Sequence, residues 1–83
     1  MTYSPPAGEI TATIVSEIYT IRYDDVGSGV AYVGEAVPGT ALNAALWRIK
    51  KIAETGDDIA ITYADGNDNF DNIWNNRLSI VYS

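Results

Sequence analysis

Apolar and polar side chains alternate along much of the chain with the period of two that is typical of β-strands. The segment from Ile10 to Tyr23 is rich in Ile, Val, Thr and Tyr, and its second half places Tyr19, Ile21 and Tyr23 on one face. Its first half runs in a different register, which predicts a bulge or a break near Ser16. We therefore expect a long first strand with an irregularity in its middle.

A turn and a second strand follow this segment. Asp24 to Gly29 reads D-D-V-G-S-G, which is turn chemistry, and Val30 to Val37 resumes an apolar strand pattern. Gly34 inside the second strand indicates a bulge or a close approach of another group to the backbone. Together the two strands predict an antiparallel hairpin.

The segment from Thr40 to Thr55 fits either a helix or a strand. As a helix it would have Thr40 as N-cap and Gly56 as its C-terminal stop, but Trp47 would then lie among polar side chains. As a strand from Ala45 to Ile52 it places Trp47 on the face opposite to its charged neighbours. Because the strand gives the largest side chain a better position, we favour the strand and keep the helix as the alternative.

Two further alternating segments complete the pattern. A turn at Glu54 to Asp57 leads into a segment with Ile59, Ile61 and Tyr63 on one face, and Leu78 to Tyr82 alternates again. We expect its apolar residues Leu78, Ile80 and Tyr82 to point inward. The expected core residues of the domain are Trp47, Ile49, Ile61, Tyr63, Ile80 and Tyr82.

These elements predict an all-β fold, a small antiparallel β-sandwich or barrel of about five strands. The alternative is an α+β fold with a helix at residues 40–55. Residues 1–9 are expected to form an extended N-terminal arm, because Pro5 and Pro6 favour polyproline geometry, and residues 10–83 a single β domain.

Composition narrows the chemistry. The 83 residues include no Cys and no His, so the chain lacks disulfides, the commonest general base and the commonest transition-metal ligand. A net charge of -6 disfavours nucleic acid and anionic membrane surfaces as partners. The first residues lack the basic start and apolar run of a signal peptide, so we expect synthesis in the cytoplasm. We expect no cofactor and no enzymatic activity.

The most polar stretch, Ile61 to Arg77, is rich in Asp and Asn. Alternate positions carry oxygen ligands that resemble those of a calcium loop: Asp65, Asn67, Asn69 and Asp71. Phe70 stands where that loop requires Gly, and Asn76 stands where it requires a bidentate Glu. The favoured interpretation is therefore a turn that bonds its own backbone, with calcium binding as the alternative.

Two pairs of acids, Asp57/Asp58 and Asp68/Asp71, are the candidates for acid–base chemistry. Hydrolysis of a sugar requires two carboxyl groups that face each other across a cleft, and the sequence indicates no cleft. We therefore expect neither pair to be catalytic.

Large aromatic side chains gather in the C-terminal half of the chain. They are Trp47, Tyr63, Phe70, Trp74 and Tyr82. In so small a domain their expected place is the core. The alternative is an exposed platform for sugar stacking, which would make the chain a small carbohydrate-binding or other non-catalytic binding module.

Four segments resemble a family of very short proteins encoded by tailed bacteriophages. They are W-R-I-K-K-I at 47–52, T-Y-A-D-G-N at 62–67, F-D-N-I-W at 70–74 and I-V-Y-S at 80–83, against the family pattern W-x-I-x-K/R-I, T-W/Y-A-D-G-N, F-D-N-V/I-W and L/I-x-Y-S. The resemblance covers Tyr32 to Ser83. It implies a multi-copy structural protein of the virion, such as a capsid decoration (cement), tail or fibre component, and transfers no catalytic residue.

The same chain is expected to assemble with other copies of itself and with other virion proteins. A domain of this size without disulfides or metal has a thin margin of stability, which oligomerisation commonly increases. The arm and the first strand offer the residues expected at such an interface: Tyr3, Pro5, Pro6, Ile10 and Ile14.

Overall fold

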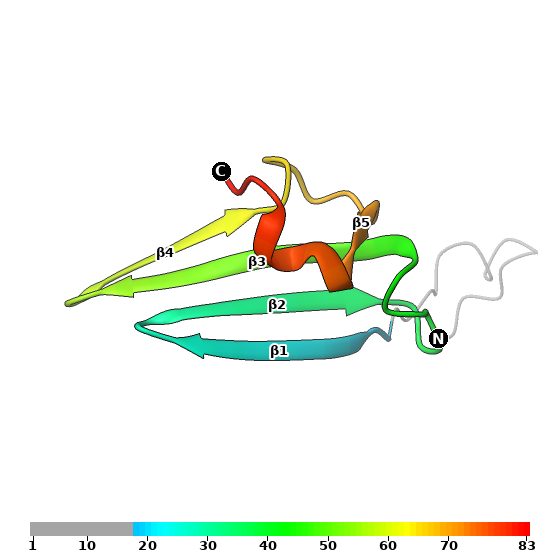
Figure 1. Cartoon of the computed structure of the whole chain (residues 1–83), viewed down its shortest axis with the longest axis horizontal. Coiled ribbons are helices and arrows are strands. Elements are labelled where there is room, and N and C mark those ends of the chain that lie inside the picture. Colours follow the sequence, from blue (N-terminus) through cyan, green and yellow to red (C-terminus); the bar gives the residue numbers. More distant parts are fainter. Residues whose placement is uncertain (1–17) are drawn as a thin grey trace, which may run out of the picture.

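The computed structural model describes residues 18–83. These residues form five strands and a 3-10 helix: β1 (Thr20–Gly27), β2 (Val30–Ala36), β3 (Ala45–Thr55), β4 (Asp58–Tyr63), β5 (Asn72–Ile73) and η1 (Trp74–Ser79). The strands pair antiparallel in the order β1-β2-β3-β4, and β5 pairs with β3 beyond the end of β4 (Figure 1). The all-β prediction is confirmed, and the alternative with a helix at 40–55 is wrong because β3 occupies most of that range.

Part of the predicted first strand lies outside the described residues. The arm at 1–9, the strand residues 10–17 and the irregularity expected near Ser16 all belong to that part of the sequence. The structure therefore bears on the first strand only from Ile18 onward.

The first hairpin is longer than the sequence predicted. β1 continues through Asp24 to Gly27, so a turn over Asp24 to Gly29 is wrong in extent, and the chain reverses at Ser28 and Gly29. The register shifts between Asp25 and Gly27, where the Asp25 carboxylate accepts a hydrogen bond of 2.9 Å from the Gly27 N–H. The Asp25 side chain thus stabilises an irregular end of β1. Asp and Gly are typical both of loops and of such bulged strand ends, so the sequence pattern did not distinguish the two.

The second hairpin joins β3 to β4 through Gly56 and Asp57, as predicted. Its register pairs Lys50 with Tyr63 and Ile52 with Ile61. The turns of both hairpins lie at the same end of the sheet, on the left of Figure 1. All four long strands therefore form one open, continuous sheet.

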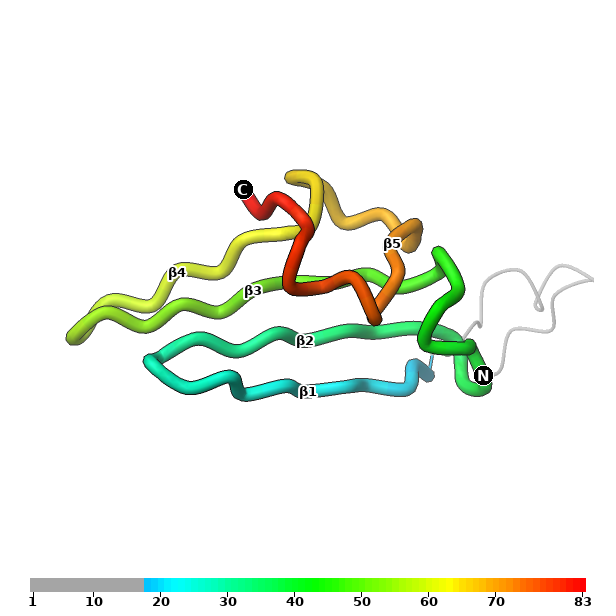
Figure 2. The backbone as a smooth tube through the Cα atoms, viewed as in Figure 1, coloured from blue at the N-terminus to red at the C-terminus, as the bar shows by residue number. Residues whose placement is uncertain are grey.

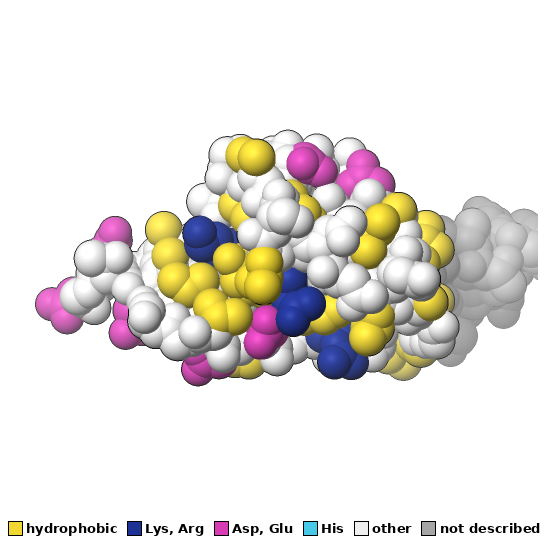
Figure 3. All heavy atoms as spheres, viewed as in Figure 1, with side chains coloured by type: hydrophobic (Ala, Val, Ile, Leu, Met, Phe, Trp, Pro, Cys, Tyr) yellow, Lys and Arg dark blue, Asp and Glu magenta, His cyan; other side chains and the backbone are white. Residues whose placement is uncertain are grey.

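Strand alternation divides the sheet into two faces. On one, which we call the covered face, η1 packs against β2 and β3, and the C-terminal residues continue from it toward the end of β4 (Figure 2). Its side chains include Tyr32, Ala36, Trp47 and Ile49, which are buried. We call the other face the open face, because among the described residues only the loop that carries Phe70 lies against it, at one end. Figure 3 looks onto the covered face and shows hydrophobic side chains gathered beside the C-terminal residues, with Lys and Arg around them.

The centre of the core is a pair of tryptophan rings. Trp47 and Trp74 are buried, and their ring centroids lie 5.9 Å apart at an interplanar angle of 40°. The indole Nε1–H of Trp47 donates a hydrogen bond of 2.9 Å to the Ala41 carbonyl, which satisfies its polar atom inside the core. Trp47, whose position in the sequence favoured a strand over a helix, is therefore a central core residue of β3.

Gly34 is where the second ring meets the sheet. A Cβ atom at this position would lie 2.5 Å from Cε3 of Trp74 and 3.1 Å from Cε3 of Trp47. The prediction of a close approach at Gly34 is confirmed, and the approaching groups are the two indole rings. The absence of a side chain at Gly34 is what allows the Trp74 ring to approach β2 so closely.

The end of the described chain is a 3-10 helix and an extended tail rather than a fifth long strand. The prediction of Leu78 as an inward residue is wrong, since it lies in η1 and is 66 % exposed. Ile80 and Tyr82 do pack against the core, as predicted. Tyr82 forms a single antiparallel bridge with Ala64, and its hydroxyl donates a hydrogen bond of 2.8 Å to the Arg77 carbonyl.

The phenol of Tyr82 lies beside a second tyrosine of the core. Its ring lies 5.5 Å from that of Tyr32. Burial, with a further contribution from Tyr32, raises the pKa of Tyr82 to about 12. The neutral phenol is therefore the form that the core accepts.

The remaining core predictions divide by face. Trp47 and Ile49 are buried as predicted. Ile61 as a core residue is wrong, because it is 54 % exposed on the open face. Tyr63, which pairs with Lys50, belongs to the same face and is half-buried. The alternating pattern therefore identified the strand correctly but assigned its apolar side to the wrong layer.

Candidate interaction surface

The open face carries apolar side chains from all four long strands. Antiparallel pairing aligns Tyr23, Val33, Lys50 and Tyr63 in one row across the sheet, which we call the Lys50 row. The next row toward the hairpin turns aligns Asp25, Ala31, Ile52 and Ile61. Tyr23 is 65 % exposed, and Ile21 beside it on β1 is similarly exposed.

The size of this surface makes it more than scattered exposure. Four strands about 4.8 Å apart, each with about six residues at about 3.3 Å, define a sheet area of about 400 Å². The largest apolar patch on a typical monomer is of this order, and such patches often mark functional sites. The sequence produces this patch because β1 and β4 place Ile or Tyr on the open side and smaller or polar residues on the covered side.

Charged groups on the open face are few and are separated along the strands. Lys50 is half-buried at the middle of the face. Glu54 lies four residues further along β3, near the hairpin turns, and Asp25 lies at the β1 edge. The ion pairs among the described residues are Arg48–Glu35 and Arg77–Asp24, so neither Lys50 nor Glu54 has an oppositely charged partner there.

Arg48 closes the open face at the end opposite the hairpin turns. Its guanidinium donates hydrogen bonds of 3.3 and 3.1 Å to one oxygen of Glu35. The same group lies 4.6 Å from the ring centroid of Phe70 and 5.8 Å from that of Tyr19. The two rings are themselves 5.1 Å apart. This cluster fixes the loop before β5 against the face through cation–π and ion-pair contacts.

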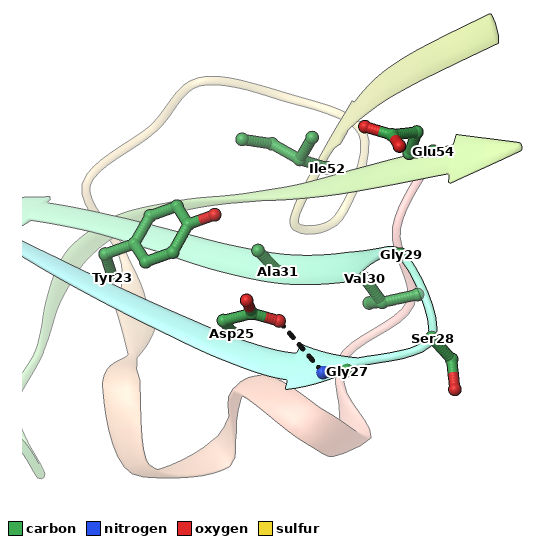
Figure 4. A pocket seen from close by; sticks show the side chains of 9 residues that line it. All are labelled: Tyr23, Asp25, Gly27, Ser28, Gly29, Val30, Ala31, Ile52 and Glu54. Atoms are coloured by element: carbon green, nitrogen blue, oxygen red, sulfur yellow. Dashed lines mark hydrogen bonds between the residues drawn. The ribbon is translucent and has the colours of Figure 1, made fainter. Parts of the chain in front are cut away.

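A hollow of about 370 Å³ lies at the hairpin-turn end of the first two strands. Residues of β1, β2 and β3 and of the first turn surround it (Figure 4): Tyr23, Asp25, Gly27, Ser28, Gly29, Val30, Ala31, Ile52 and Glu54. Gly29 has φ +78°, and a Cβ atom there would lie 2.6 Å from the Glu54 carbonyl oxygen. Four of the lining residues, Gly27, Ser28, Gly29 and Ala31, contribute little or no side chain, which leaves space at the turn.

The predicted calcium candidates lie on the loop between β4 and β5 and are all exposed: Asp65, Asn67, Asn69 and Asp71. The Asn67 Oδ1 accepts a hydrogen bond of 3.0 Å from the Asn69 N–H, and its Nδ2 donates one of 3.4 Å to the Asp65 carbonyl. Such contacts are those of an Asx turn. Within residues 18–83 no group of three or more His, Cys, Asp or Glu is arranged to hold a metal ion.

The two acid pairs singled out from the sequence lie in different parts of the molecule. Asp57 and Asp58 lie at the β3–β4 turn, whereas Asp68 and Asp71 lie in the loop that precedes β5 (Figure 1). All four carboxylates are exposed. The structure therefore does not bring the Asp57/Asp58 pair and the Asp68/Asp71 pair together into one site.

The predicted interface residues Tyr3, Pro5, Pro6, Ile10 and Ile14 lie outside the described residues, so their contacts stay a prediction. The surface that sequence reasoning missed is the open face. A signal for it was present, since β3 and β4 place large apolar residues on opposite sides: Trp47 and Ile49 face one way, and Ile52 and Ile61 the other. A sheet with apolar residues on both sides requires a cover on each.

No protein-family model, curated protein or solved structure matches this chain. Among residues 18–83, no helix has the length and apolar character that crossing a membrane requires.

Proposed function

We propose that this chain is a multi-copy structural protein of a tailed-bacteriophage particle, a capsid decoration, tail or fibre component that acts through protein–protein contacts. The observation that carries the proposal is the open face, whose exposed apolar side chains come from all four long strands in a chain of 83 residues. The resemblance of its four segments to very short phage proteins supplies the setting.

Covering the open face with a partner would lower the free energy of the domain, because it would bury exposed apolar side chains. Burying apolar area yields about 25 cal/mol per Å², so exposure of Tyr23, Ile59 and Ile61 leaves several kcal/mol of stabilisation unused in the isolated domain. A particle built from many copies supplies covering surfaces at high local concentration. The partners of the proposed function are therefore other copies of this chain and other virion proteins.

The alternative of a carbohydrate-binding module has less support. Stacking on a sugar ring requires an exposed aromatic face, and tryptophan suits this best. Trp47 and Trp74 are both buried in the core, where they contact each other. The two tryptophans among the aromatic residues that prompted this alternative therefore already have a structural role.

Mass spectrometry of purified particles tests the proposal. Particles of the phage whose genome encodes this chain should contain its peptides in many copies per particle, at a constant ratio to the major capsid protein across gradient fractions. A non-structural protein of the same genome serves as the control and should be lost during purification. Presence of the chain in the infected lysate together with its absence from the particles would refute the proposal.

A further inference from the structure

We propose that the open face binds the same face of a second copy, in a two-fold dimer that lays the Lys50 row of each chain over Glu54 and Gly29 of the other. The inference deepens the proposed function by naming the partner of that surface, and it rests on that function only for its biological setting. The dimer itself is a property of the purified chain. Two independent features of the open face, one of charge and one of shape, require the same arrangement.

The charge feature is the separation of Lys50 from Glu54 along one strand. Both residues point to the open face, because they lie four residues apart on β3, whose register with β2 and β4 is uninterrupted over the paired residues. The separation is about 13 Å, too far for a pair within one chain. A two-fold axis that crosses the strands at Ile52 exchanges positions 50 and 54. Each lysine of the dimer then lies opposite the glutamate of the other copy.

The shape feature is the proximity of an exposed ring to a hollow. Tyr23 belongs to the Lys50 row, and its ring stands 65 % exposed at one side of the hollow. The hollow continues to Gly27, Ser28 and Gly29 at the turn (Figure 4). Gly29 accepts the backbone hydrogen bond of Glu54, at 2.7 Å, so the floor of the hollow lies level with Glu54.

The rotation that brings Lys50 over Glu54 therefore also brings Tyr23 of one copy over the glycine-lined hollow of the other. A volume of about 370 Å³ accommodates a phenol ring. The ring and the hollow occur twice in the dimer, once in each direction, as an isologous interface requires. The same two-fold arrangement therefore pairs Lys50 with Glu54 and places Tyr23 over the hollow.

The resulting object is a sandwich of two sheets about 10 Å apart, a standard packing for sheets with apolar faces. Asp25 lies near the level of the axis on the edge strand β1, so the two Asp25 carboxylates lie near each other at the exposed rim of the contact, where solvent and salt screen their repulsion. Overlap is limited to the hairpin-turn half of each sheet, which leaves the cluster of Arg48, Tyr19 and Phe70 outside the contact. Because the overlap is smaller than a standard interface, we expect a dissociation constant on the order of micromolar.

Sedimentation velocity of the full chain over a range of protein concentration tests the dimer. Lys50→Glu and Glu54→Lys should each raise the dissociation constant by about tenfold or more, since each replaces two attractive pairs by two repulsive ones. The double variant K50E/E54K restores attraction with the charges exchanged, and it should recover a dissociation constant near that of the unmodified chain. Tyr23→Ser should raise the dissociation constant of the dimer. In that background K50E/E54K should still bind more tightly than either single charge variant.

Lys51→Glu is the matched control, because Lys51 is the next residue of β3 and points to the covered face. It makes the same change of charge and should leave the dissociation constant within about twofold. Far-UV circular dichroism of each variant verifies that the sheet is retained, so loss of the dimer is separated from loss of the fold.

Four results would overturn the inference. The first is that the full chain sediments as a monomer at concentrations far above micromolar. The second is that K50E and K51E change the dissociation constant equally, and the third is that the double variant K50E/E54K does not recover the dimer. A chain that becomes dimeric only after deletion of residues 1–17 would also overturn it, because its own N-terminal segment would then be the occupant. These outcomes are distinct from failure of the proposed function: a dimeric chain missing from particles refutes the virion role alone, and a monomeric chain found in particles refutes the dimer alone.

Discussion

Replacement of Gly34 by alanine tests the packing on which the covered face depends. The new Cβ atom would lie 2.5 and 2.7 Å from two carbons of the Trp74 ring, whereas ordinary contacts begin at 3.4 Å. The ring would have to withdraw from β2 by about 0.9 Å to restore such a contact. Trp74 is only 3 % exposed and packs against Trp47, which is more completely buried, so little free space is available for that movement.

The expected loss of stability follows from two opposing terms. Overpacking of a filled core costs about 1–3 kcal/mol. Replacing glycine by alanine restricts the unfolded chain and returns about 0.4–1 kcal/mol. We therefore expect Gly34→Ala to lower the free energy of unfolding by about 1–2 kcal/mol. Trp74→Ala, which removes the ring altogether, should lower it by about 3–5 kcal/mol.

A double-mutant cycle separates this mechanism from a general effect on β2. Urea unfolding followed by far-UV circular dichroism, at one fixed protein concentration, gives the free energy for the unmodified chain, each single variant and the pair. In the Trp74→Ala background the added methyl group has room, so Gly34→Ala should become neutral or slightly stabilising. The coupling energy between the two sites should be about 2 kcal/mol.

The reasoning is refuted if Gly34→Ala changes stability by less than about 0.5 kcal/mol in the unmodified chain. It is also refuted if the substitution costs the same whether or not the indole is present. Trp74→Leu provides a milder second background should the alanine variant be too unstable to measure.

Three further perturbations test other contacts of the described residues. The pKa of Tyr82 is about 12 in the folded state and about 10 in the unfolded state, so the contribution of its neutral form to stability is complete below pH 10 and declines between pH 10 and 12. After allowance for partial solvent exposure, we expect the free energy of unfolding to fall by about 1–2 kcal/mol over this range. Urea unfolding at each pH measures this loss, which should be absent in Tyr82→Phe. Arg77→Met removes the 2.9 Å pair with Asp24 that ties η1 to β1, and it should cost about 1 kcal/mol, with part of this as coupling in a cycle with Asp24→Asn; full additivity would contradict the pair. Arg48→Ala should raise hydrogen exchange in the loop around Phe70 while leaving the β3–β4 amides protected, and unchanged loop exchange would show that the cluster does not hold the loop.

Strand positions were predictable because they depend on local alternation. Trp47 decided β3, since only a strand separates it from Arg48 and Lys50, and the structure places it in the core. Gly34 was correctly expected to admit a close neighbour. Both inferences used one residue and its immediate surroundings in the sequence, which is the range over which a period of two carries information.

The assignment of faces was not predictable in the same way. The alternation of Ile59, Ile61 and Tyr63 shows that they share a side, but only the course of residues 72–82 determines which side of the sheet is covered. The turn of η1 likewise depends on tertiary contacts, such as the hydrogen bond of 3.1 Å from the Asn75 N–H to the Leu42 carbonyl. The candidate interaction surface was missed for this reason: it is defined by the absence of a covering segment, a property of the whole chain.

The order of the strands has a consequence for how the molecule folds. Each long strand pairs with its neighbour in the sequence, and such local pairings form rapidly because they close short loops. The covered face closes much less locally, since the contact between Arg77 and Asp24 spans 53 residues. The meander can therefore form while both of its faces are still bare. During that interval the C-terminal segment and any other copy compete for the same apolar side chains, so the rate at which a chain completes its own core sets how long it is open to incorrect association.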